Sequence, residues 1–493
     1  MSHRRRPHDT SVSPDSAKRS RLRRSTSSSL PKRSTFPSYL DVPNISPKIR
    51  LFCDLLANTP ASSVEFVLQD SSLRVSSSRD VEEVLKLSYA FPNTATKFFR
   101  WSGAQIRDQH SPYAWNLIVD ILGKNKLFEA MWDAVKTMRH QKILSMVTFA
   151  SIFSSFTEAE LFDESFKAFE VMEDYGVSRN VTALNSLLSA VCRVGKTQRG
   201  CEFLGIARKT IRPDADSYAI LLEGWENEGD AKNAVETFAE MVGVVGWDPS
   251  NVPAYDSFLT TLIKAGGISE AMKHLGLIRD KGCLPGMKFF RAALNEYDKE
   301  KDYRGGTVIW EMMAWKNKAC EPDLSMYNKM IRLLCYRDHL NTAYKLMDEM
   351  ILYGLFPDRE TYNLMLKSSI KGKKMVDVAL LFNEMLKNDH LPLPENCRDS
   401  LKLFLESDDM KMALKVWKCM VNNQMQPLEM DGNDLVLKLR DLDMLAEACK
   451  YAEQMAEKGI KLRSSTLSKL KTSLCKIGRE PMYRQLLQKW KLR

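Results

Sequence analysis

A repeat of about 35 residues is the feature that most constrains the fold of this 493-residue chain. Aromatic or leucine residues recur at spacings of 34 to 37, at Trp115, Phe149, Leu184, Tyr218, Tyr255, Phe290, Tyr327 and Tyr362. A second, mostly methionine series follows each of them 23 residues later, at Met138, Met172, Ala207, Met241, Ile278, Met313, Met350 and Met385. The constant 23 indicates rigid packing inside a unit, whereas the variable remainder indicates a turn. Because so short a unit cannot bury its own apolar face, the period predicts a stack of repeats.

Each unit has the apolar pattern of two helices. In residues 324–358, apolar side chains follow helical spacing from Tyr327 to Leu334 and again from Ala343 to Met350. Pro357 then stops the second helix, and Asp358 can cap the next one. Since no unit shows the alternation of a strand, the sequence predicts an all-α solenoid of about ten helix-turn-helix repeats.

The repeat period divides the chain into four parts. Residues 1–50 form a basic tail, 51–111 an N-terminal helical cap with one degenerate repeat, 112–463 ten repeats, and 464–493 a partial repeat. The predicted units are 112–145, 146–180, 181–214, 215–251, 252–286, 287–323, 324–358, 359–394, 395–428 and 429–463.

Several segments resemble the pentatricopeptide repeat. They are Thr361-Tyr362-Asn363-Leu364, Gly354-Leu355-Phe356-Pro357-Asp358, Leu346-Met347-Asp348-Glu349-Met350 and Leu474-Cys475-Lys476-Ile477-Gly478-Arg479. The period of 35 and the Pro-Asp ending separate this family from the 34-residue tetratricopeptide repeat. The resemblance implies a right-handed superhelix and a plant-type organellar protein of the P class, which has pure 35-residue repeats and no C-terminal extension domain. It also implies sequence-selective binding of single-stranded RNA, with one unit per base.

The resemblance further implies two base-reading positions in each unit, the residue after the aromatic and the last residue. In this chain the best pairs are Asn116 with Ser145, Asn185 with Asp214, and Asn328 with Asp358, and Asn363 is paired with Pro394. Asn-Asp pairs resemble uracil readers, and the Asn-Ser pair resembles a cytosine reader. An amide offers both a donor and an acceptor to a base edge. For the Asp residues, helix capping alone is an alternative role.

A set of basic residues recurs at the thirteenth position of the units. Its members are Lys124, Arg193, Lys264, Lys299, Lys371 and Lys476. A cation at the end of a helix also favours the helix dipole, so capping is again an alternative. Aligned along a solenoid, the six residues predict a stripe that contacts RNA phosphates.

The net charge of +10 is concentrated at the N-terminus. Residues 1–50 hold 12 Lys or Arg and three acidic residues, which leaves the other 443 residues with a net charge of +1. RNA binding therefore requires a patterned basic surface rather than bulk charge. An Arg- and Ser-rich segment without Glu is typical of an organellar transit peptide, and we predict the mitochondrion. The chloroplast is an alternative, and the basic run from Lys18 to Arg24 is equally typical of nuclear import.

No motif points to catalysis. Gly195-Lys196-Thr197 suggests a phosphate-binding loop, but the first glycine of that motif is replaced by Ala190. The ten cysteines and seven histidines lack metal-ligand spacing. We therefore predict no enzyme activity, metal, cofactor, small-molecule substrate or membrane partner. The predicted function is site occupation on organellar transcripts (in stabilisation, processing, splicing or translation), possible partners being other RNA-processing factors. A protein-binding scaffold of the tetratricopeptide type is the rival, and the pairs Asp256–Gly286, Arg291–Asp323 and Asp399–Leu428 favour it.

Overall fold

The computed structural model describes residues 36–491 except 108, 317–320 and 427. Of the predicted transit peptide, residues 1–35 lie outside the described part. Throughout the described part every regular element is a helix, as the repeat period predicted. The helices fall into two compact units, one reaching to Ala159 and including Tyr175–Val177, the other comprising Glu160–Asp174 and Ser178–Arg493.

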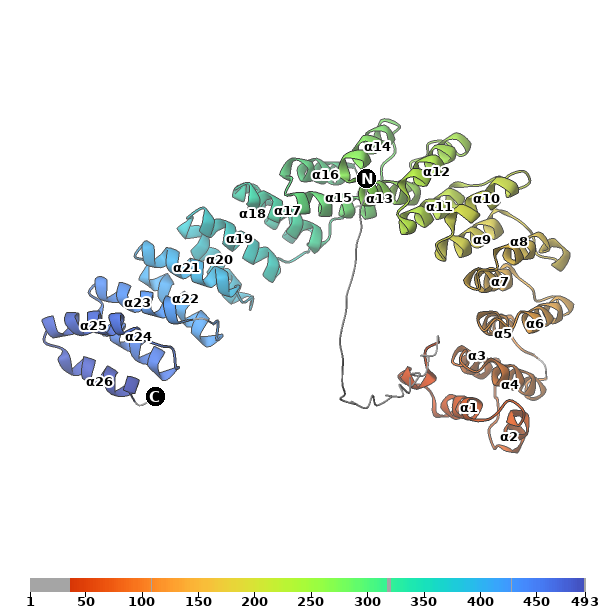
Figure 1. The fold of residues 1–493 in the computed structure, drawn as a ribbon, viewed down its shortest axis with the longest axis horizontal. Coiled ribbons are helices and arrows are strands. Elements are labelled where there is room, and N and C mark those ends of the chain that lie inside the picture. Colours follow the sequence, from red (N-terminus) through yellow and green to blue (C-terminus); the bar gives the residue numbers. More distant parts are fainter. Residues whose placement is uncertain (1–35, 108, 317–320, 427, 492–493) are drawn as a thin grey trace, which may run out of the picture. The chain divides into compact units, whose positions relative to one another are not determined.

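The first unit contains seven α-helices (Figure 1). Their bounds are α1 Pro47–Asn58, α2 Val64–Asp70, α3 Ser78–Lys86, α4 Pro92–Gln105, α5 Pro112–Lys124, α6 Phe128–His140 and α7 Met146–Glu158. The boundary predicted at residue 50 falls inside α1. Folded structure begins before it, because the Tyr39 side chain is buried and its hydroxyl donates to Asp54 Oδ1 at 2.7 Å.

The second unit continues the same plan, with each first helix packed on its own second helix and on the first helix of the next repeat. Its early helices are α8 Phe162–Glu170, α9 Val181–Arg193, α10 Thr197–Ala207, α11 Ala215–Glu228, α12 Ala231–Val244, α13 Val252–Gly266, α14 Ile268–Asp280, α15 Met287–Glu300 and α16 Tyr303–Lys316. The later helices are α17 Leu324–Tyr336, α18 Leu340–Leu352, α19 Arg359–Lys371, α20 Met375–Lys387, α21 Pro394–Glu406, α22 Met410–Asn422, α23 Glu429–Asp441, α24 Leu445–Glu457, α25 Ser464–Lys476 and α26 Glu480–Lys491. This stacking of helical hairpins in chain order is α-solenoid architecture (Figure 1).

The two periodic series form the core of the hairpins. Tyr327 and Met350 are both fully buried, on the first and second helices of the same repeat. The Tyr327 hydroxyl also donates to Glu349 Oε1 at 3.0 Å, and Tyr362 reaches Glu384 Oε1 at 2.9 Å in the same way. The tyrosine hydroxyl bonds a glutamate 22 residues later in the chain, and the next residue, such as Met350, is buried in the same hairpin. These contacts account for the constant spacing of 23 residues within a repeat.

The repeat boundary predicted at Pro394 is wrong by one residue. Helix α21 begins at Pro394, and its N-cap is Leu393, whose carbonyl accepts from the Cys397 N–H at 3.0 Å. Proline suits this first helical position because its missing N–H would have no partner there. Leu393 is therefore the equivalent of Asp358, and the preceding repeat ends at 393. Position five of α21 is then Arg398 rather than Asp399.

Candidate nucleic-acid interface

The predicted base-reading residues occupy equivalent places in the fold. The first is always the fifth residue of a repeat's first helix, and the second, except for Pro394, is the N-cap of the first helix of the next repeat. Successive first helices pack side by side, for example α9 on α11 and α17 on α19. This packing brings each fifth residue against the following N-cap.

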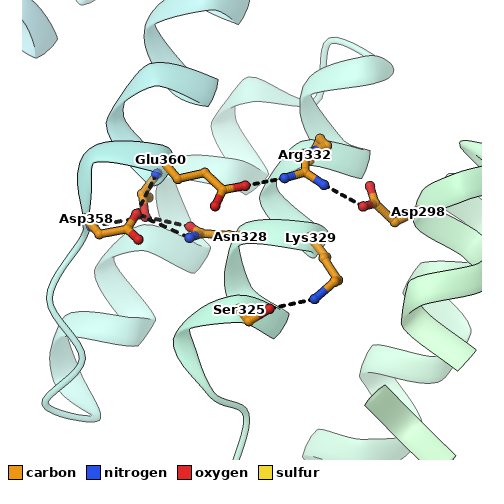
Figure 2. A network of polar contacts seen from close by, with 8 residues as sticks. Asp298, Ser325, Asn328, Lys329, Arg332, Asp358 and Glu360 are labelled. Atoms are coloured by element: carbon orange, nitrogen blue, oxygen red, sulfur yellow. Dashed lines mark hydrogen bonds and ion pairs between the residues drawn. The ribbon is translucent and has the colours of Figure 1, made fainter. Parts of the chain in front are cut away.

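Asn328 and Asp358 meet in this way at the start of α19 (Figure 2). The Asn328 Nδ2 donates to Asp358 Oδ1 at 3.2 Å, and the Thr361 hydroxyl donates to Asn328 Oδ1 at 2.6 Å. Asp358 Oδ1 also accepts from the Thr361 N–H at 2.8 Å, and Thr361 Oγ1 lies 3.2 Å from the Asp358 N–H. The N-cap of α19, its third residue and the fifth residue of α17 thus form one closed network.

The same network recurs at the start of α11, four repeats earlier in the second unit. Asn185 Nδ2 donates to Asp214 Oδ1 at 3.0 Å, and the Ser217 hydroxyl donates to Asn185 Oδ1 at 2.6 Å. The Ser217 N–H donates to Asp214 Oδ1 at 2.9 Å. Two copies with the same donors and acceptors indicate a motif of the repeat.

Electrostatics keeps both aspartates ionised. Burial acts to raise the pKa of Asp358, but the hydrogen bonds from Thr361 and Asn328 outweigh it and hold the pKa below its usual value. For Asp214, burial is likewise outweighed, by the hydrogen bonds from Asn185 and Ser217. An ionised carboxylate only accepts hydrogen bonds, so it fixes which end of each amide faces it.

Asn116 has part of this arrangement in the first unit. Its Oδ1 accepts from the Thr148 hydroxyl at 2.7 Å, and the N–H of the N-cap Ser145 lies 3.4 Å from Thr148 Oγ1. Thr148 is the third residue of α7, as Thr361 is of α19. The predicted Asn116–Ser145 pair is therefore brought together around a hydroxyl.

Asn363 is bonded differently. Its Oδ1 accepts from the Leu393 N–H at 2.8 Å and from Asn396 Nδ2 at 2.9 Å, while its own Nδ2 donates to the Arg359 carbonyl at 2.7 Å. Leu393 offers no capping oxygen, so the Asn363 amide takes up the backbone N–H of the N-cap. Pro394, the predicted partner, makes no part of this contact.

Asn433 holds the same position in α23, and the sequence reading missed it. Its Oδ1 accepts from the Arg463 N–H at 2.9 Å, and its Nδ2 donates to the carbonyls of Glu429 and Lys461 at 2.7 and 3.0 Å. It was missed because Gly432 stands where the other repeats have an aromatic or leucine residue. The 35-residue spacing from Tyr362 through Cys397 to Gly432 was the signal that could have found it.

Two of the pairs that favoured a protein-binding scaffold, Asp256–Gly286 and Arg291–Asp323, are in direct contact. Asp256 Oδ1 accepts from the Gly286 and Phe289 N–H groups at 2.7 and 3.1 Å, which caps α15 from the neighbouring helix. Burial raises the pKa of Asp256 against these hydrogen bonds. Arg291 Nη2 lies 2.8 Å from Asp323 Oδ2. Both pairs join adjacent repeats, so they no longer count as evidence for a separate scaffold segment.

The six predicted phosphate-contacting residues all lie near the ends of first helices, and three of them have acidic partners. Lys124 pairs with Glu158, Lys264 with Glu226 at 3.0 Å, and Lys299 with Glu296 at 2.6 Å. The other three, Arg193, Lys371 and Lys476, are exposed and have no acidic partner among the described residues. Acidic residues take the same thirteenth position in α7, α21 and α23, at Glu158, Glu406 and Asp441. The predicted stripe is therefore interrupted.

The second position of the first helices also carries charge. Glu360 and Asp298 flank the Arg332 guanidinium, as Figure 2 shows. Lys288 lies 2.5 Å from Glu226 Oε2, so that this buried carboxylate is shared with Lys264. Glu360 and Lys288 each hold this second position, two residues before the core aromatic residues Tyr362 and Phe290.

The described residues contain no cluster of three His, Cys, Asp or Glu side chains suited to hold a metal ion. None of the described helices combines the length and the apolar character that crossing a lipid bilayer requires.

Fold and site together define a helical-repeat protein of the α-solenoid class, in which several first helices offer one polar side chain to the start of the next. Residues 322–371 match the PPR repeat family model, and residues 360–390 match the PPR repeat model. Residues 322–390 therefore carry pentatricopeptide repeats.

Relatives with the same repeats occur in Arabidopsis thaliana. A pentatricopeptide repeat-containing protein named as mitochondrial is 34% identical over 171 residues, covering 35% of this chain and 33% of that protein. Another, also named as mitochondrial, is 24% identical over 374 residues, covering 75% of this chain and 64% of that protein. The matched part thus spans between a third and two thirds of these relatives. A crystal structure of the pentatricopeptide repeat protein PPR10 in complex with an 18-nt psaJ RNA element is 19% identical, with a TM-score of 0.39, covering 89% of this chain and 67% of that one.

Proposed function

We propose that this chain binds single-stranded RNA in a sequence-selective manner, with individual repeats contacting individual bases. One observation carries the proposal: polar side chains recur at the fifth position of first helices, and Asn185, Asn328 and Asn363 each contact the N-cap of the next repeat. A site that recurs once per repeat suits a polymer with a repeating unit better than a compact ligand.

The proposed base contacts are made by Asn116 with Ser145, Asn185 with Asp214, and Asn328 with Asp358, with Asn363 as a further contact. In the two Asn-Asp pairs, one amide N–H is bonded to the carboxylate, which leaves the second N–H and Asp Oδ2 for a base. A donor beside an acceptor matches the Watson–Crick edge of an unstacked base. For uracil, the N–H would donate to a carbonyl while the carboxylate accepts from the ring N–H.

Phosphate contacts are proposed for the thirteenth-position cations Lys124, Arg193, Lys264, Lys299, Lys371 and Lys476. The strongest support concerns Arg193, Lys371 and Lys476, because they have no acidic partner among the described residues. Lys124, Lys264 and Lys299 would have to leave a carboxylate in order to bind a phosphate. Counter-ion release from such contacts makes binding depend on salt.

The repeats after residue 393 fit a polyanion poorly. A groove of about 810 Å³ runs between α21 and α23. Its lining holds six acidic and three basic residues: Glu395, Asp399, Glu406, Asp431, Asp434 and Asp441 against Arg398, Lys402 and Lys438. We therefore propose that the base contacts lie on the repeats that end at Leu393, and that beyond the acidic groove only Lys476 contacts the RNA, at a phosphate.

The protein would act by occupying its RNA site, without catalysis, on organellar transcripts. Support for the mitochondrion comes from the names of the Arabidopsis relatives and from the acid-poor, Arg- and Ser-rich start of the sequence. A fusion of residues 1–60 to a fluorescent protein tests the location. Mitochondrial fluorescence is expected, and accumulation in the nucleus or the chloroplast would contradict this part of the proposal.

The binding proposal is tested with the purified full chain and a pool of randomised 20-nucleotide RNA. After selection, sequencing of the bound fraction should give one enriched motif, and double-stranded RNA of that motif should bind far more weakly. Bound RNA that keeps the composition of the input, or equal binding of both forms, would contradict the proposal.

A further inference from the structure

The third residue of the following first helix completes each hydroxyl-linked network. Thr148, Ser217 and Thr361 are fully buried, and each donates its hydroxyl hydrogen to the Oδ1 of an asparagine in the preceding repeat. A fully buried hydroxyl cannot itself touch RNA. Its effect on RNA can only pass through the asparagine.

The hydroxyl settles the orientation of the amide. Thr361 has one hydrogen to donate, and the contact to Asn328 Oδ1 at 2.6 Å is shorter than the contact to Asp358 Oδ1 at 2.9 Å. The Asp358 carboxylate needs donors, so the amide nitrogen turns toward it and the amide oxygen turns toward Thr361. Without the hydroxyl, a flip of the amide would offer oxygen where the fixed amide offers N–H.

The sequence couples the two positions from repeat to repeat. Where the fifth residue is the apolar Ala219, the third residue of the next first helix is the apolar Ala254. Where the fifth residue is asparagine, the partner position holds a hydroxyl or an amide, at Thr148, Ser217, Thr361, Asn396 and Thr466.

We propose that a third residue whose hydroxyl is bonded to the asparagine of the preceding repeat is a positioning residue for the base contact of that repeat, so that the base preference of one repeat depends on a hydroxyl in the next. The inference rests on the proposed function. It assigns this role to Thr148, Ser217 and Thr361, which hold Asn116, Asn185 and Asn328 with an N–H directed at the RNA.

Asn433 lacks this hydroxyl contact. Both of its N–H groups donate to carbonyls and its oxygen accepts a backbone N–H, so no hydrogen remains for a base. The Thr466 hydroxyl at the partner position is buried and has no hydrogen-bond partner among the residues that the structure describes. Thr466 is therefore a matched control for Thr361: the same residue at the same position, without contact to the asparagine.

The experiment is selection from the randomised 20-nucleotide RNA pool with the full chain and its Thr361→Val, Thr361→Ser and Thr466→Val variants. Valine has the shape of threonine without the donor, and serine keeps the donor. In Thr361→Val we expect the preference at one position of the motif to fall about tenfold, as for one lost hydrogen bond. That position is the one that an Asn328 substitution changes. Thr361→Ser and Thr466→Val should keep the wild-type motif.

A purely structural role would weaken binding to all sequences and leave the motif intact. The inference is overturned if Thr361→Val retains the wild-type preference while an Asn328 variant shifts it. A wild-type chain that enriches no motif would instead contradict the proposed function itself. If Thr361→Val does not fold, Ser217→Ala makes the same test at the position contacted by Asn185.

Discussion

Asn328 and Asn433 occupy the same position in their helices and use their hydrogen-bonding groups differently. Asn328 gives one N–H to a carboxylate, whereas Asn433 gives both to backbone carbonyls. The difference follows from the N-cap, because Asp358 caps α19 with its own side chain and Arg463 leaves its N–H to Asn433. A residue type at a repeat position therefore does not define a role until its neighbours are known.

Gly432 shows how one missing side chain is compensated. A Cβ at this position would lie 2.6 Å from Trp417 Cη2 and 2.6 Å from Met455 Cε. Trp417 comes from the second helix of the preceding repeat and is nearly fully buried. Its ring thus occupies the place that an aromatic residue of the first helix fills in other repeats.

Gly432→Ala should therefore destabilise the second unit. Overpacking typically costs about 1–3 kcal/mol, which exceeds the gain of up to about 1 kcal/mol from replacing glycine in a helix. Gly276→Ala, in α14 with nothing within 4 Å of the added Cβ, is the matched control and should raise stability slightly. Urea unfolding followed by circular dichroism measures both. Equal midpoints for the two variants would show that Trp417 and Met455 move aside freely.

At the scale of helices and their ends, the sequence predicted most of the architecture. The aromatic and methionine series are core residues on paired helices, because both periods are fixed by packing. The sequence-based prediction failed where a helix start is capped by a side chain from another helix. Asp256 caps α15 from a different helix, and the N-cap Leu393 has no capping side chain, so neither shows a local signature. The Asn-Asp pairs were predictable as neighbours, whereas the linking hydroxyls depend on side-chain directions that no spacing reveals.

The Asp358 cap should contribute measurably to stability in a pH-dependent way. Asp358→Ala removes the acceptor of the Thr361 N–H, at a typical cost of about 1 kcal/mol. Because the folded pKa is lowered, this stabilisation is present above the unfolded value of about 3.9 and is lost as the pH falls through the folded value. Urea midpoints of wild type and variant should differ at pH 7, and the difference should shrink progressively as the pH falls below the unfolded value. Asp348→Ala, an exposed carboxylate on α18, is the control and should differ little across this pH range. A gap for Asp358→Ala that stays unchanged as the pH falls below the unfolded value would contradict the assigned cause.

On the scale of the whole molecule, charge is distributed to suit a patterned interaction rather than bulk attraction. The chain beyond residue 50 is almost neutral, and half of the thirteenth-position cations pair with carboxylates. A neutral body with a few unpaired cations limits non-specific binding, so base contacts can decide which RNA is bound.

Replacing Arg193, Lys371 and Lys476 with alanine should flatten the dependence of log affinity on log salt. Each phosphate contact to a single strand contributes about 0.7 to the slope, so the triple variant should lose about 2. The matched control replaces Lys124, Lys264 and Lys299, whose acidic partners oppose phosphate binding, and should lose less. Filter binding of the selected RNA from 50 to 300 mM salt gives both slopes. Equal slopes for both variants and wild type would restrict these residues to helix capping.

The central claim is that single repeats recognise single bases, and the repeat at 324–358 tests it most directly. The full chain and its Asn328→Thr variant are each selected against the randomised 20-nucleotide RNA pool. Threonine replaces the amide and loses the N–H that contacts Asp358 Oδ1. The account predicts uracil at one position of the wild-type motif, and in the variant a shift at that position alone, toward guanine by the pairing rules of the family. The discrimination should be roughly 1–3 kcal/mol. Identical motifs for both proteins, or a change spread over all positions, would contradict base recognition by this repeat.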